Sequence, residues 1–85
     1  MRLIWADIEG TEYEVVKSPD AFHQDTWELE PGVSSAMLNV RRMTDGAVLC
    51  LVVNETDSAK LFTKDGRTQI GAGPKKWVDK ADKTI

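Results

Sequence analysis

The chain has 85 residues, 41% of them apolar and 29% charged, and its formal net charge is -3. A chain of this length supplies one hydrophobic core, so a single domain over residues 1–85 is predicted, and the composition excludes a fibrous or disordered protein. With one cysteine and no apolar run near the roughly 20 residues of a membrane helix, we expect a cytoplasmic protein that does not enter a membrane.

The first predicted elements are two strands joined by a tight turn. Side chains alternate in character over residues 2–8 and again over residues 11–17, which is the period-two pattern of strands. Glu9-Gly10 lies between them, and glycine tolerates the positive φ that tight hairpin turns require. The sequence therefore predicts an amino-terminal hairpin.

One or two helical turns are predicted next, over residues 18–24. Ser18-Pro19 suits the start of a helix, because serine caps unpaired amides and proline fits the first helical position. We expect Phe22 to be the buried contact of this helix. A short third strand is predicted over residues 27–30, and Pro31-Gly32 favours a turn after it.

A hairpin is predicted in the middle of the chain, with strands over residues 36–43 and 47–54 joined by Asp45-Gly46. The second of these strands is apolar on both faces, a pattern typical of a strand covered on both sides. We therefore expect it to lie at the centre of the fold. Its thiol, Cys50, is predicted to be buried and inert, because no Lys, Arg or His is close to it in sequence.

A third hairpin is predicted around Asp65-Gly66, with strands over residues 60–63 and 67–70. This hairpin is more polar than the middle one, and charged side chains are typical of the edge of a sheet. Gly71-Ala72-Gly73 is then expected to end the strand pattern. A short terminal helix is predicted over residues 75–83, with Trp77 docking it on the sheet.

Together these elements predict a mainly β fold. We expect a small antiparallel β-meander or curled barrel of six to seven strands, with one or two short helical segments. An open sheet covered by the terminal helix is the alternative architecture that the same pattern allows.

Charge is unevenly distributed along the chain. Residues 1–32 contain eight acidic and two basic side chains, whereas residues 33–85 contain six acidic and nine basic ones. A surface of one sign attracts partners of the opposite sign, so this asymmetry favours a charged interaction face. If the two halves interleave in the fold, the charges instead mix over the surface.

An acidic face is predicted on the strands of the first half. Alternation places two glutamates on one side of the second strand and two on one side of the third. Such a face would bind a basic protein surface, as small acidic inhibitors, immunity proteins and phage-encoded modulators of host machinery do. We therefore predict a small non-enzymatic protein-interaction module, although a solvated strand face explains the same pattern. The predicted protein-binding residues are Glu12, Glu14, Asp25, Trp27, Glu28 and Glu30.

An alternative function uses the basic carboxyl-terminal segment. Lys75, Lys76, Trp77 and Lys80 combine cations with an aromatic ring, which is what single-stranded nucleic acid requires of its binding site. Acidic residues are interspersed among these bases, and the chain as a whole is acidic, which disfavours this reading. In that alternative Trp77 stacks on a base; otherwise it anchors the tail to the body.

No catalytic, cofactor-binding or metal-binding residue is predicted. The single histidine, His23, stands near Asp20 and Asp25, but it lacks the further His or Cys ligands of a zinc site. Ser34 and Ser35 lack the nucleophile elbow and oxyanion loop that a serine hydrolase needs. An enzyme whose groups assemble only in an oligomer is the least favoured hypothesis.

Overall fold

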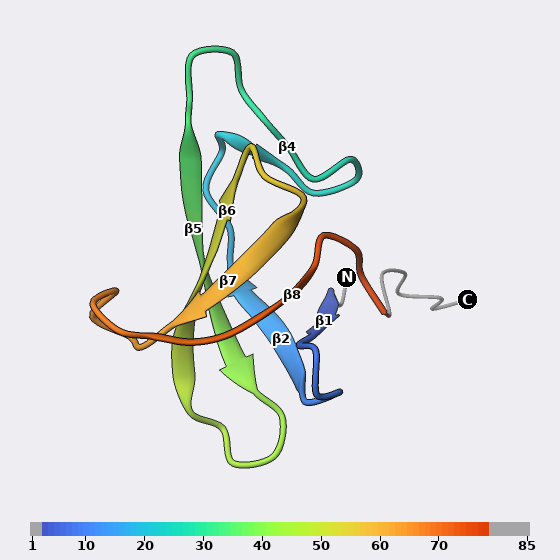
Figure 1. The fold of residues 1–85 in the computed structure, drawn as a ribbon, viewed down its shortest axis with the longest axis vertical. Coiled ribbons are helices and arrows are strands. Elements are labelled where there is room, and N and C mark those ends of the chain that lie inside the picture. Colours follow the sequence, from blue (N-terminus) through green and yellow to red (C-terminus); the bar gives the residue numbers. More distant parts are fainter. Residues whose placement is uncertain (1–2, 79–85) are drawn as a thin grey trace.

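The fold is built from short antiparallel strands. The computed structural model describes residues 3–78, and over this range the chain forms eight β-strands and no helix (Figure 1). Nothing in this range is a helix with the length and apolarity needed to cross a membrane. The strands are β1 (Ile4–Ala6), β2 (Glu12–Lys17), β3 (Phe22–His23), β4 (Glu28–Leu29), β5 (Ser35–Arg42), β6 (Val48–Asn54), β7 (Ser58–Phe62) and β8 (Gln69–Pro74).

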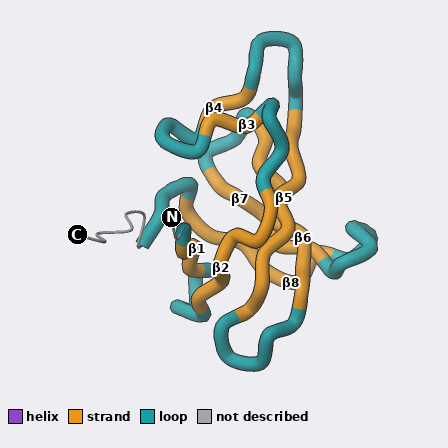
Figure 2. Tube along the Cα trace, turned by 180° about the vertical axis from the view of Figure 1, so that it is seen from behind, coloured by secondary structure: helices purple, strands orange, loops and turns teal. Residues whose placement is uncertain are grey.

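Six of the strands form one curled sheet in the order β1-β2-β5-β6-β7-β8, and β3 and β4 form a separate hairpin (Figure 2). All neighbouring strands in these sheets are antiparallel, so the predicted mainly β fold is confirmed. The predicted hairpin around Asp45-Gly46 is the longest pairing, from Ser35 opposite Asn54 to Arg41 opposite Val48. Gly46 has a φ of 78°, as a tight turn of this kind requires.

The hydrophobic core lies on the inner face of the curled sheet. Strands β5 and β7 alternate buried inner residues with more exposed outer ones, and β6 follows the same pattern except at Cys50. The inner side chains of Leu38, Leu51 and Leu61 are at most 1% exposed, and Trp5 of β1 is fully buried among them. Strand β6 lies between β5 and β7, so its predicted central position is confirmed.

Cys50 lies on the outer face of β6, yet it is only 4% exposed. The turn between β7 and β8 covers it, and its thiol donates a hydrogen bond to the carbonyl oxygen of Lys64 at 3.3 Å. The predicted burial of this cysteine is therefore confirmed, with the turn rather than the core as its cover. Its inertness toward thiol reagents stays a prediction.

Strands β1 and β8 are first and last in the strand order, and the chain at these two strands comes together. The sheet is therefore curled into a half-barrel. The amide of Ile8 donates to the carbonyl of Ala72 at 2.9 Å, and the indole Nε1 of Trp5 donates to the carbonyl of Pro74 at 2.8 Å. Gly73 permits this approach, because a Cβ at this position would lie 2.7 Å from Cζ2 of Trp5 and 2.8 Å from the carbonyl oxygen of Ala6. The sheet thereby acquires a closed inner face and a separate outer face.

Two sequence predictions near the ends of strands are wrong. Residues 18–24 are not helical: Phe22 instead pairs with Leu29 in the β3–β4 hairpin, although Phe22 is buried as expected. Local capping signals were weaker here than the pairing of the two strands. Gly71-Ala72-Gly73 does not end the strand pattern but lies within β8, where the absent side chain of Gly73 admits Trp5.

The predicted terminal helix is wrong over the part that is described, because residues 75–78 are not helical, and its remainder at 79–83 lies outside the described residues. The segment instead bends after β8, and the amide of Val78 donates to the carbonyl of Ile4 at 2.8 Å. The expectation that Trp77 anchors this segment to the body is confirmed, since its ring packs against the core.

Truncating the centre of the core should destabilise the protein far more than truncating its outer face. Leu51→Ala should lower the free energy of unfolding by about 2–5 kcal/mol, because it removes buried methyl groups and leaves a cavity. Met37→Ala is the control on the neighbouring strand, where the side chain is 53% exposed, and it should cost less than about 1 kcal/mol. Chemical denaturation measures both, and equal losses would contradict the assignment of inner and outer faces.

Candidate functional site

The predicted acidic residues fall into two separate groups. Glu12 and Glu14 lie on β2, whereas Glu28 and Glu30 lie at the β3–β4 hairpin with Asp25 in its turn. Both views show β2 in the lower half of the molecule and β4 in the upper half (Figures 1 and 2). The six predicted residues therefore do not come together as one surface.

The group on β2 is partly neutralised. Glu14 lies opposite Arg41 of β5, and the Nη2 atom of Arg41 is 3.1 Å from Oε1 of Glu14. The Glu14 side chain is 24% exposed, while Glu12 is exposed. This ion pair is a cross-strand contact between β2 and β5, and the positive charge of Arg41 offsets the negative charge of Glu14.

The β3–β4 hairpin carries the second group on a short, tight scaffold. Phe22 pairs with Leu29 and His23 with Glu28, and the amide of Trp27 donates to the carbonyl of His23 at 2.9 Å. The imidazole Nε2 of His23 contacts the carboxylate of Glu30 next to the hairpin. Hydrogen bonds within the hairpin therefore hold its backbone in place, and its charged side chains are exposed to solvent.

Trp27 positions this hairpin and is not itself a surface contact. It is 7% exposed, its φ is 60°, and its indole Nε1 has no hydrogen-bond partner within residues 3–78. A positive φ is unusual for a bulky residue, and here the surrounding rings impose it. Phe22 packs edge-on against Trp27 with ring centroids 5.4 Å apart, and the ring of Trp77 is tilted by 36° to that of Trp27 with centroids 4.2 Å apart. The predicted role of Trp27 in binding therefore requires an exposure that this structure does not give it.

Two open clefts flank the hairpin, and carboxylates line both. A cleft of about 390 Å³ lies between the hairpin and the loop after β6, where Glu28 and Glu30 face Glu55 and Lys75. A shallower one of about 680 Å³ lies on the other side, where its lining residues include Asp20, Asp25 and Glu28. The clefts extend the acidic surface over both sides of the hairpin.

Sequence reasoning missed two members of this acidic surface, Asp20 and Glu55. Asp20 lies in the segment for which helical turns are predicted, and Glu55 belongs to a loop in the basic half of the chain. Only the fold brings Glu55 to the hairpin, so no local sequence signal points to it. Lys75 also lines the cleft between the hairpin and the loop after β6, and its Nζ donates to the carbonyl oxygens of Asn54 and Thr56 at 2.8 and 2.9 Å.

Two of the four residues predicted for the nucleic-acid alternative, Lys75 and Trp77, already make contacts within the protein. Lys75 holds the loop after β6, and Trp77 packs on Trp27 while its Nε1 donates to the carbonyl of Gln24 at 2.8 Å. Lys76 is exposed, and Lys80 lies outside the described residues. Within the described range, a base would have to displace an internal contact of Trp77 in order to stack on it.

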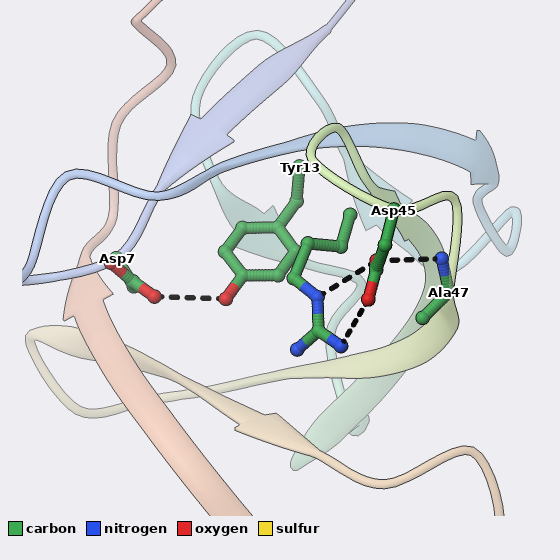
Figure 3. Close-up of polar contacts among 5 residues, drawn as sticks. Asp7, Tyr13, Asp45 and Ala47 are labelled. Carbon is green, nitrogen blue, oxygen red and sulfur yellow. Dashed lines mark hydrogen bonds and ion pairs between the residues drawn. The ribbon is translucent and has the colours of Figure 1, made fainter.

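A polar network joins the turns at the other end of the sheet (Figure 3). The hydroxyl of Tyr13 donates to Oδ2 of Asp7 at 2.8 Å, and Arg42 donates from Nε and Nη2 to the two carboxylate oxygens of Asp45 at 3.0 and 2.9 Å. Burial, followed by the Asp7 carboxylate, raises the pKa of Tyr13 to about 12. The hydrogen bond from Arg42, with one from the amide of Ala47, lowers the pKa of Asp45 to about 2.

This network is suited to holding turns in place. A general acid or base works best with a pKa near the operating pH, and the pKa values of Tyr13 and Asp45 are displaced away from neutrality. Between residues 3 and 78 no group of three or more His, Cys, Asp or Glu side chains is arranged to hold a metal ion.

Comparisons of the chain with protein-family models, with curated proteins and with solved structures gave no match.

The hydroxyl of Tyr13 should titrate about two pH units above an ordinary phenol. It is the one tyrosine of the chain, so the ultraviolet absorbance of tyrosinate reports it alone. Its pKa is raised from 10.0 to about 12, so the stability that the neutral phenol contributes is complete below pH 10 and is lost as the pH rises toward 12. A midpoint near 10 while circular dichroism still reports folded protein would contradict this environment. Asp7→Asn should lower the midpoint without restoring 10.0, because burial is the larger cause.

Proposed function

We propose that this chain is a non-enzymatic interaction module that binds a basic protein surface through the β3–β4 hairpin. The observation that carries the proposal is the gathering of acidic side chains from three segments of the chain around that one hairpin. The segments are the approach to β3, the hairpin itself and the loop after β6. The acidic residues concerned are Asp20, Asp25, Glu28, Glu30 and Glu55.

The anchoring of the hairpin supports this proposal. Trp27 packs between Phe22 and Trp77, and Trp77 in turn bonds to the carbonyl of Gln24. A surface that is ordered before binding loses less conformational entropy when a partner arrives. Carboxylates presented in this way steer a cationic partner toward the hairpin and fix its orientation.

The proposed binding surface contains fewer of the residues that the sequence predicted for an acidic face. Glu12 and Glu14 are left out, since they lie on β2 and Arg41 already pairs with Glu14. An acidic module of this kind would act by covering a cationic groove of its partner, including one that otherwise holds nucleic acid. We place the protein in the cytoplasm, where a free thiol such as that of Cys50 stays reduced.

Reversing charge on the hairpin should abolish binding while leaving the fold intact. The variant Asp25→Lys with Glu28→Lys should lose the basic proteins that the unaltered chain captures from native lysate, and weaken affinity for a captured partner about tenfold or more. Glu12→Lys is the matched control, because it reverses an exposed charge on β2 and should leave capture unchanged. Thermal unfolding of each variant checks that the domain remains folded.

Either of two outcomes would contradict the proposal. Equal capture by the hairpin variant and the unaltered chain would show that these carboxylates do not bind the partner. Affinity for a labelled single-stranded oligonucleotide that falls steeply with salt and is lost in Lys76→Glu would instead favour the nucleic-acid alternative.

A further inference from the structure

The one histidine of the chain lies in the acidic β3–β4 hairpin. His23 belongs to β3, and its imidazole Nε2 contacts the carboxylate of Glu30, just beyond β4. The His23 side chain is 51% exposed and that of Glu30 is 47% exposed, so both are open to protons and to a partner. Strand register places Glu28 directly opposite His23, and directly opposite residues of two strands point to the same face. The imidazole therefore contacts one carboxylate and shares its side of the hairpin with another.

The shallow cleft that His23 lines contains further carboxylates. Its described lining residues include Asp20 from the approach to β3, Asp25 from the turn and Glu28 from β4. The remaining described residues of this lining are uncharged, so His23 is the member that can carry a positive charge. A proton on the imidazole therefore introduces positive charge into a surface that is otherwise negative.

The charged groups of the neighbouring segments do not change their charge with that of the imidazole. Lys75 and Glu55 line the cleft on the other side of the hairpin, where the Nζ of Lys75 donates to backbone carbonyls at the end of β6 and beyond it. Lys17 ends β2, and Lys76 is exposed in the segment after β8. Histidine is the side-chain type that changes charge between about pH 8 and about pH 6, whereas lysine and carboxylate side chains ordinarily stay charged there.

We propose that protonation of His23 weakens the binding of a basic partner to the β3–β4 hairpin. The inference rests on the function proposed above, because it concerns the regulation of the same surface. A neutral imidazole leaves the negative charge of Glu30 available to a cation of the partner. An imidazolium pairs with Glu30 and offsets that charge, so the partner has to compete with it for the carboxylate. An ion pair between exposed groups corresponds to about a two- to fivefold change in affinity, so the switch reduces binding without abolishing it.

The test measures the binding of one cationic probe at two pH values. The probe is a hexa-arginine peptide with blocked ends, because the guanidinium groups of arginine stay charged at both. Nuclear magnetic resonance of isotope-labelled protein should show saturable shifts at the carbon-bound hydrogens of residues 20–30 at about pH 8. At about pH 6 the dissociation constant should be about two- to fivefold higher. The ring signals of the one histidine report its protonation alone, and the change in affinity should follow them.

Variants at both members of the contact identify the titrating group. Glutamine keeps a hydrogen-bond donor beside Glu30 but takes up no proton, so His23→Gln should bind the peptide equally at the two pH values. Glu30→Gln removes the carboxylate that the imidazole contacts, so it should bind more weakly at about pH 8 and depend less on pH. Glu12→Gln is the control, since it removes an exposed carboxylate of β2 and should leave the pH dependence unchanged. The amide spectrum of each variant shows whether it is folded.

The possible results distinguish this inference from the function on which it rests. If the peptide gives no saturable shifts at the hairpin at about pH 8, both the proposed function and the inference are contradicted. If the peptide binds the hairpin but its affinity does not fall toward about pH 6, the inference alone is overturned. The inference is also overturned if His23→Gln loses as much affinity over this range as the unaltered chain does.

Discussion

The contact between Trp5 and β8 is the interaction on which the rest of the structure depends. The indole ring reaches Gly73 and its Nε1 bonds to the carbonyl of Pro74, which joins residues 69 positions apart in sequence. This contact turns a succession of hairpins into a curled sheet with an inner and an outer face. The apolar side chains of β5, β6 and β7 then share one core instead of lying on an open sheet, where a small domain buries little surface.

The same closure supports the acidic hairpin. Beyond β8 the chain passes β1, where the amide of Val78 bonds to the carbonyl of Ile4, and this places Trp77 against Trp27. Trp27 has an unusual backbone conformation that its neighbours maintain, so the hairpin depends on the segment that follows β8. The curled sheet and the position of the acidic hairpin therefore both depend on the packing of the chain along and beyond β8.

The sequence predicted those features that local chemistry determines. Asp45-Gly46 specifies a turn by itself, and the uninterrupted apolar character of residues 47–53 indicates a covered strand. The predictions from sequence were wrong where a contact between residues far apart in the chain determines the local structure. The helix expected at residues 18–24 gave way to the pairing of Phe22 with Leu29, and the strand continues through Gly73 because Trp5 packs there. For the acidic site, Glu28 and Glu30 were found by alternation, but Glu55 joins them only through the fold, and the burial of Trp27 depends on Trp77.

A comparison of two glycine substitutions in β8 tests the central contact most directly. A Cβ at Gly73 would lie 2.7 Å from the ring of Trp5, whereas a Cβ at Gly71 would lie 3.6 Å from Leu61, an ordinary contact distance. Gly73→Ala should therefore lower the free energy of unfolding by about 1–3 kcal/mol or more, and Gly71→Ala should change it by less than about 1 kcal/mol. If Gly73→Ala is neutral or stabilising, as alanine for glycine in an unconstrained strand would be, the closure described here is contradicted.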